Sequence, residues 1–211
     1  MASFSLVHGA WGGGWLWDPL RAELEARGHV VHTPDLPCED VSAGVAEYAA
    51  GVPPADVVVG YSLGGLTIPF VEADTHVFLA ARVAGAVGDW EEVFVPGFGD
   101  ARVRDELGRS YYPDLGDAVR ELQIPPEHGH LAVKLRRQAR APYDAPPARV
   151  ERPASIVCTR DAVIRPDWQR RVAQEVLGVE PLELDAGHSP MLECPRELAV
   201  LLDGLASQLR S

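Results

Sequence analysis

The stretch that decides the fold class is ADVVVGYSLG, residues 55–64 of the 211-residue chain. Its apolar first half predicts a buried strand, and its second half, from Gly60 to Gly64, has the pattern Gly-x-Ser-x-Gly. A strand that breaks into this pattern and then into a helix is typical of a nucleophile elbow, a sharp turn that holds a serine side chain clear of the backbone. Glycines flank the serine because neighbouring strand and helix atoms leave no room for a Cβ atom. Ser62 is therefore the candidate nucleophile.

The length and composition of the chain fit a single globular domain. The 211 residues can form a substantial core, and 46% of them are hydrophobic. No apolar run approaches the ~20 residues of a membrane span. Met1 leads almost at once into the strand-like run FSLV, without the basic region of a signal peptide. We expect one domain over residues 1–211, no membrane partner and a cytoplasmic location.

The charge and the cysteines exclude several other classes of protein. A formal net charge of −12 repels phosphate backbones, so nucleic acid is not an expected partner. Cys38, Cys158 and Cys194 are widely spaced, which argues against a disulfide framework or a zinc site. We expect no metal and no cofactor. The chain has no asparagine and one lysine, Lys134, a bias that fits the GC-rich codons of a bacterial gene.

Strand-like runs alternate with helical patterns through most of the chain, which predicts an α/β fold with a mostly parallel sheet and helices on both faces. The predicted strands are residues 3–8, 29–33, 56–60, 75–81, 154–159 and 181–184. The predicted helices are residues 15–27, 41–49, 63–72, 167–177 and 195–209.

The alternation stops between residues 88 and 149, which are rich in Gly, Pro and aromatic residues. We predict that this segment is a cap inserted between two strands, because such lids commonly close active sites. Within it, residues 131–141 predict a helix that is basic on one side: Lys134, Arg136, Arg137 and Arg140. This cluster is either a solvated helix face or an electrostatic contact to an acidic substrate or partner.

A serine nucleophile needs a base, and the base needs an orienting acid. His188 follows the last predicted strand, where α/β proteins place functional loops, and it is the candidate base. Asp161 directly follows the preceding strand and is the candidate acid. Asp185 and Asp167 are rivals, but Asp185 is too close to His188 along the chain, and Asp167 has the position of a helix cap.

The oxyanion of an acyl-transfer reaction requires backbone N–H donors. Leu63, directly after the nucleophile, supplies one candidate. The loop after the first strand reads HGAWGGG, residues 8–14, and its small residues let the backbone approach a substrate. We expect the Ala10 amide to be the second donor, and His8 to be structural.

Together these motifs resemble the small serine-type α/β-hydrolases of the branch that includes plant methyl-ester esterases, hydroxynitrile lyases and bacterial esterase-like proteins. The segments that carry the resemblance are LVHGAW (6–11), GYSLGG (60–65), CTRD (158–161) with Trp168 and Gln169, and AGHSPM (186–191). The resemblance implies a Ser62–His188–Asp161 triad, an oxyanion hole from the Ala10 and Leu63 amides, and no cofactor.

The chain departs from that branch in three places. Relatives often have a histidine in the oxyanion loop, where this chain has Gly12. Hydroxynitrile lyases use a lysine near the site, whereas the lysine of this chain, Lys134, lies in the predicted cap. The cap has no segment that we recognise from the branch, so the substrate does not follow from the resemblance.

Other residues remain as candidates for binding. His128 and His130 form a possible metal pair, but no distant third ligand is evident, which favours a plain loop. The aromatic residues of the cap line a pocket or form the cap's own core: Trp90, Phe94, Phe98, Tyr111 and Tyr112. We expect Trp11, Tyr61 and Trp90 to contact the substrate.

Three functions follow from these predictions. The first is hydrolysis of an ester, thioester or related acyl bond of a small-molecule or peptide-like substrate through an acyl-enzyme. The second is a natural-product tailoring reaction on the same fold, such as acyl transfer, cyclisation, ring opening or elimination. The third is a ligand-binding protein without catalysis. The sequence does not predict the oligomeric state.

Overall fold

The computed structural model describes residues 1–86 and 88–208. Within them, one parallel sheet has the strand order β2-β1-β3-β4-β7-β8, and every neighbouring pair in it is parallel. Its strands are β1 (Ser3–Val7), β2 (Val30–His32), β3 (Ala55–Tyr61), β4 (Ala73–Leu79), β7 (Pro153–Cys158) and β8 (Leu182–Leu184). All six overlap the strands predicted from the sequence.

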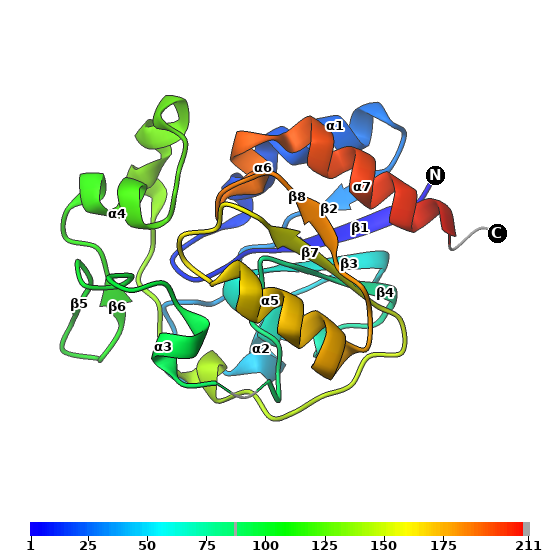
Figure 1. The fold of residues 1–211 in the computed structure, drawn as a ribbon. Coiled ribbons are helices and arrows are strands. Elements are labelled where there is room, and N and C mark those ends of the chain that lie inside the picture. The colour runs from blue at the N-terminus through cyan, green and yellow to red at the C-terminus, as the bar shows by residue number, and fades with distance from the viewer. Residues whose placement is uncertain (87, 209–211) are drawn as a thin grey trace.

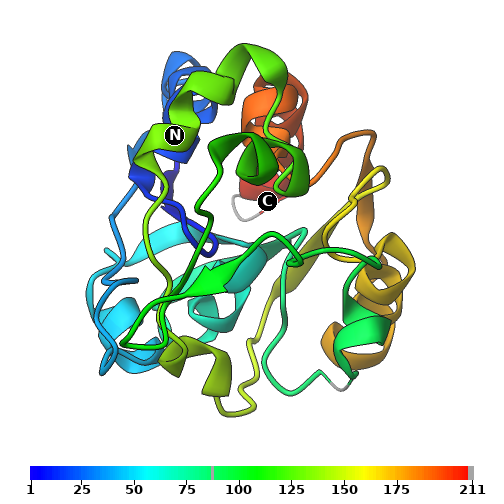
Figure 2. The same ribbon diagram turned by 90° about the vertical axis from the view of Figure 1, so that its left-hand side faces the viewer.

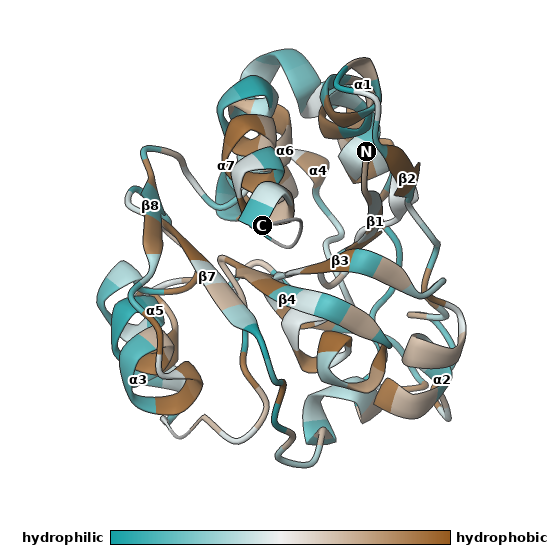
Figure 3. Ribbon diagram, turned by 90° about the vertical axis from the view of Figure 1, so that its right-hand side faces the viewer, coloured by the Kyte–Doolittle hydropathy of each residue, from teal (hydrophilic) through white to brown (hydrophobic). Residues whose placement is uncertain are grey.

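Helices cover both faces of this sheet, as parallel sheets require because their strands are apolar on both sides. One face carries α1 (Asp18–Ala26), α6 (Pro190–Glu193) and α7 (Pro195–Gln208). The opposite face carries α2 (Val45–Ala50) and α5 (Pro166–Val172), which continues as a π-helical turn over Ala173–Leu177 (Figures 1 and 3). The predicted α/β fold class, with a parallel sheet and helices on both faces, is confirmed. Residue 209, the predicted end of the last helix, lies outside the described residues.

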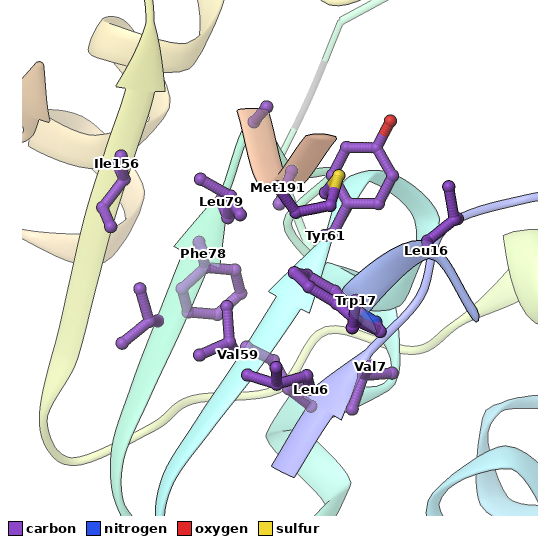
Figure 4. Packing of buried hydrophobic residues seen from close by; sticks show 14 of the residues in the cluster. Leu6, Val7, Leu16, Trp17, Val59, Tyr61, Phe78, Leu79, Ile156 and Met191 are labelled. Atoms are coloured by element: carbon purple, nitrogen blue, oxygen red, sulfur yellow. The ribbon is translucent and has the colours of Figure 1, made fainter. Parts of the chain in front are cut away.

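One part of the core lies between the central strands and the layer that contains α1 and α6. Leu6, Val59 and Leu79 come from β1, β3 and β4, and they are fully buried. Trp17 and Met191 pack onto them from the covering layer (Figure 4). Each such side chain contributes about 1.5–3 kcal/mol through burial, so the strands that carry the candidate site are firmly held.

A long segment, residues 80–152, lies between the neighbouring strands β4 and β7. It contains α3 (Trp90–Val93), the hairpin of β5 (Val103–Arg104) and β6 (Ser110–Tyr111), α4 (Leu115–Glu121), and 3₁₀ helices over Pro126–Lys134 and Ala141–Asp144. Its hairpin and α4 lie beyond the carboxyl ends of the strands (Figures 1 and 2). The predicted cap, residues 88–149, falls within this segment.

The helix predicted over residues 63–72 is wrong in type. The chain instead forms two short 3₁₀ helices, Ser62–Leu66 and Ile68–Phe70. Pro69 interrupts helical hydrogen bonding, and the next strand begins already at Ala73, so no space remains for a longer helix.

The basic helix predicted over residues 131–141 is also wrong. The 3₁₀ helix ends at Lys134, and the following backbone is extended. Gln138 exchanges both backbone hydrogen bonds with Ser110, and the amide of Arg136 donates to the carbonyl of Trp11. These long-range bonds replace the helical ones that the local pattern predicted.

No helix in residues 1–86 or 88–208 combines the length and the apolar content that a bilayer crossing needs.

Two glycines give a matched test of the packing around the elbow. A Cβ atom at Gly64 would lie 2.5 Å from the carbonyl oxygen of Val7 and 2.8 Å from that of His8, whereas one at Gly204 in α7 meets open space. We predict that Gly64→Ala lowers the free energy of unfolding by about 1–3 kcal/mol through overpacking. Gly204→Ala should raise it by about 0.5–1 kcal/mol because alanine favours a helix. Urea denaturation measures both, and equal values for the two variants would contradict this packing.

Candidate active site

Ser62 occupies a strained turn directly after β3. Its φ angle is 51°, a conformation that residues with a side chain rarely adopt. Such a backbone conformation destabilises the folded state by about 1–3 kcal/mol. The turn closes because Gly60 and Gly64 have no side chains: a Cβ atom at Gly60 would lie 2.8 Å from the carbonyl oxygen of Gly64. The predicted elbow is therefore present, and it lifts the Ser62 hydroxyl away from the sheet.

Ser62, His188 and Asp161 lie in one chain of hydrogen bonds. The Nε2 atom of His188 is 3.1 Å from the Oγ atom of Ser62, and its Nδ1 atom is 2.9 Å from the Oδ2 atom of Asp161. The side chains of Asp161 and His188 are buried. The three sequence candidates, which are separated by up to 126 positions, thus meet at the carboxyl ends of β3, β7 and β8.

The Asp161 carboxylate is fully hydrogen-bonded. Its Oδ1 atom accepts from the amides of Val163 and Ile164, at 2.8 and 3.0 Å. Its Oδ2 atom accepts from Nε2 of Gln169 at 2.8 Å, besides the His188 ring. These donors stabilise the charged carboxylate in a buried position. Gln169 lies in one of the segments that resemble the family, but no sequence pattern assigns it to Asp161.

The loop that holds His188 is tied to the inserted segment. The Oε1 atom of Gln123 accepts from the amides of His188 and Ala162, at 2.9 and 2.7 Å. The hydroxyl of Ser189 donates to the carbonyl of Leu122. Gln123 therefore joins the loops of the candidate base and the candidate acid. No sequence signal predicts this role, because it depends on how α4 packs against two distant loops.

The rival acids lie outside the site. The Asp185 side chain is 84% exposed and pairs with Arg160. The Asp167 side chain is 98% exposed and pairs with Arg170 in the first turn of α5. The geometry therefore favours Asp161 as the partner of His188.

The loop after β1 passes directly beside Ser62. A Cβ atom at Gly9 would lie 2.9 Å from the Cβ atom of Ser62, so a glycine is needed at this approach. Ala10 and Leu63 both line the cavity onto which Ser62 opens. The amide of Leu63 lies in the first turn of a 3₁₀ helix, where amides have no acceptor within the helix. This arrangement suits the two predicted oxyanion donors.

His8 supports that loop from behind. Its Nδ1 atom lies 2.8 Å from the carbonyl oxygen of Gly9, and its Nε2 atom accepts from the amide of Leu36 at 2.9 Å. This pair of contacts requires a neutral ring with its proton on Nδ1. Burial lowers the pKa of His8 from 6.5 to about 4. His8 is thus structural, as the sequence predicts.

The cavity at Ser62 has a volume of about 340 Å³. Trp11 and Trp90 line it, as expected for substrate contacts, together with Phe94, Phe98 and Tyr143. Tyr61 does not line it. Its ring is buried and packs against His188, with centroids 5.0 Å apart, and against Trp17. We therefore place Tyr61 behind the site rather than in the wall that meets a substrate.

Most of the basic cluster predicted on the cap lies away from this cavity. Lys134 is exposed beside the ring of Trp15, and Arg136 and Arg137 pair with Glu39 and Asp105. Arg140 lines the cavity.

The residues that the structure describes contain no cluster of three or more His, Cys, Asp or Glu side chains that could hold a metal ion.

Comparison with known proteins agrees with this fold. A model of the alpha/beta hydrolase family matches residues 6–201. The chain is 25% identical to Methylesterase 3 of Arabidopsis thaliana, over 96% of this chain and 95% of that protein. It is 28% identical to Pyrethroid hydrolase of Sphingobium wenxiniae, over 92% and 84%. The crystal structure of a pyrethroid hydrolase from Sphingobium faniae JZ-2 has a similar fold, with a TM-score of 0.79, 23% identity and 97% of each chain covered.

The chain belongs to the alpha/beta hydrolase family. It is an enzyme of the esterase-like class within that family.

The position of His8 predicts a specific loss of stability in acid. The folded state holds this ring neutral, and its pKa is below the unfolded value, so its contribution is complete above pH 6.5. As the pH falls from 6.5 to about 4, that contribution declines by about 3 kcal/mol. Urea denaturation across this range should show a smaller decline for His8→Asn than for the wild type. His130→Asn, in an exposed position, is the control, and equal pH slopes for His8→Asn and the wild type would contradict the prediction.

Proposed function

We propose that this protein hydrolyses an ester, thioester or related acyl bond of a small-molecule or peptide-like substrate through an acyl-enzyme on Ser62. The observation that carries this proposal is the continuous chain of hydrogen bonds from Ser62 through His188 to Asp161, which ends in a cavity. A hydroxyl alone is a weak nucleophile, and this arrangement supplies what it lacks.

In the proposed mechanism, the Oγ atom of Ser62 bonds to the carbonyl carbon while its proton passes to Nε2 of His188. Asp161 holds the proton on Nδ1 and stabilises the charged ring. The carbon–oxygen bond to the leaving group then breaks, and His188 gives its proton to the departing alcohol. In the second half of the reaction, His188 takes a proton from a water molecule, and the water oxygen attacks the acyl carbon. The bond from that carbon to Oγ of Ser62 then breaks, and His188 returns the proton to Ser62 as the acid leaves.

The oxyanion that forms in each step would be held by the amides of Leu63 and Ala10. The support for this role is the close approach of the Gly9 backbone to Ser62 and the free first turn after the elbow. Donors that are already in place need no rearrangement during the reaction, and one such donor contributes roughly 3–4 kcal/mol to a hydrolase.

The alternative functions have less support. Lyase chemistry of the hydroxynitrile type requires a lysine at the site, but Lys134 is exposed and does not line the cavity. Acyl transfer or cyclisation would use the same Ser62 machinery, and products formed without net addition of water would favour them. A binding protein without catalysis has no need for a buried, fully hydrogen-bonded Asp161 behind His188.

Turnover of 4-nitrophenyl butanoate by three variants tests the proposed roles. We predict that Ser62→Ala and Asp161→Asn each lower kcat by roughly 10⁴-fold or more, because the three groups act as a unit. Asp185→Asn is the matched control and should leave kcat almost unchanged, since its pair with Arg160 is exposed. A large loss in Asp185→Asn, or full activity of Ser62→Ala, would refute the assignment.

A further inference from the structure

The cavity at Ser62 concentrates positive charge in a chain whose net charge is −12. Among the described residues, four arginines line it, and no Asp or Glu does. They are Arg82, Arg102, Arg104 and Arg140. A cleft lined by one sign of charge attracts groups of the opposite sign, and its low-dielectric walls strengthen the effect.

The backbone of Arg82 is anchored to that of the candidate nucleophile. Its backbone amide donates to the carbonyl of Ser62 at 2.9 Å. Its guanidinium carbon lies 5.6 Å from the centre of the Phe94 ring, and its buried Nε atom has no hydrogen-bond partner among the described residues. Burial lowers the pKa of Arg82, because the site is poorly solvated. A partly buried cation without a carboxylate partner is costly for the fold, and an anionic ligand would offset that cost.

Arg102 is held by aromatic rings rather than by an acid. Its guanidinium carbon lies 4.9 Å from the ring centre of Trp11 and 4.7 Å from that of Phe98. The side chain passes where a Cβ atom of Gly99 would otherwise lie. Its hydrogen bond within the described chain is a long one, 3.4 Å, from Nε to the carbonyl of Gly99. Cation–π contacts therefore fix the guanidinium while its terminal nitrogens remain available as donors.

Tyr143 lines the same cavity as the four arginines. Burial raises the pKa of Tyr143, and the positive charges of the four arginines oppose that rise. Within the described part of the chain, only Arg140 among the four has a carboxylate within ion-pair distance. Its partner is Asp144, and both side chains are largely exposed.

We propose that this arginine cluster binds an anionic group of the substrate, a carboxylate or a phosphate, so that the enzyme cleaves small anionic acyl esters. Arg82 and Arg102 hold the anion, and Arg104 and Arg140 add charge around it. A cavity of about 340 Å³ suits a compact substrate of this kind. The inference rests on the proposed function, because it names the substrate class of the same site.

Three matched esters test the proposal by release of 4-nitrophenol. Mono-4-nitrophenyl glutarate carries a free carboxylate, 4-nitrophenyl 4-carbamoylbutanoate is its neutral isostere, and 4-nitrophenyl 4-phosphonobutanoate carries a phosphonate. We expect kcat/KM to be roughly ten- to a hundredfold higher for an anionic ester than for the neutral one. The preference should decrease as salt is added. A larger value for the glutarate identifies carboxylate as the anion, and a larger value for the phosphonate identifies phosphate.

Arginine variants test which side chains cause the preference for anionic over neutral esters. Arg82→Gln and Arg102→Gln should each bring the ratio of anionic to neutral kcat/KM towards one, and Arg82→Lys should restore part of it. Because Arg82 forms no ion pair with a described residue, Arg82→Gln leaves no acidic side chain without its partner. This variant should therefore fold, and thermal unfolding checks this. Arg21→Gln, on α1 and paired with Asp18, is the control and should keep the wild-type ratio. A wild-type ratio of one or less, or a ratio unchanged in both glutamine variants, overturns the proposal.

A binding measurement separates this proposal from the proposed function. Calorimetric titration of the wild type and Arg82→Gln with glutarate and with inorganic phosphate requires no turnover. If the wild type binds either anion and Arg82→Gln does not, the anion site is supported, whether or not the esters are cleaved. If none of the esters is cleaved, only the esterase proposal is rejected. Ester cleavage without anion binding or charge preference would reject the anion site and leave the esterase proposal intact.

Discussion

The close backbone contact between the elbow and β1 is the constraint on which the rest of the site depends. Gly64 packs against the carbonyl oxygens of Val7 and His8, and Gly9 packs against Ser62 itself. These contacts hold Ser62 at a φ angle of 51° and bring the candidate oxyanion loop beside it. A side chain at either glycine would separate the two segments. The strain of the turn is offset by the packing of buried strands on both sides of it.

The parts of the site that the sequence predicts are those that follow directly from strands. Ser62, Asp161 and His188 each come immediately after a predicted strand or in the loop beyond it. Because parallel strands end at one edge of a sheet, such residues must lie near one another. The same reasoning predicts the amides of Ala10 and Leu63 as oxyanion donors. The fold was predictable for a related reason, since apolar runs that alternate with helical patterns leave little choice of architecture.

The parts that the sequence does not predict depend on contacts between distant segments. Gln123 and Gln169 fix the loops of His188 and Asp161, but neither belongs to a pattern that could reveal this. In place of the helix predicted over residues 131–141, the structure has a backbone bridge between Gln138 and Ser110. The sequence left open whether the basic residues of that segment are solvated or contact a substrate, because whether an arginine meets a carboxylate or a cavity is set by tertiary packing.

Trapping of the reaction intermediate tests whether Ser62 forms the proposed covalent acyl-enzyme. The enzyme is mixed with a 4-nitrophenyl ester, quenched with acid within the first turnovers, digested and analysed by mass spectrometry. We expect an acyl group on the peptide that contains Ser62 and no acylation of the Ser62→Ala protein. Acylation of another residue, such as Cys194, in an enzyme that still turns over the ester would contradict it.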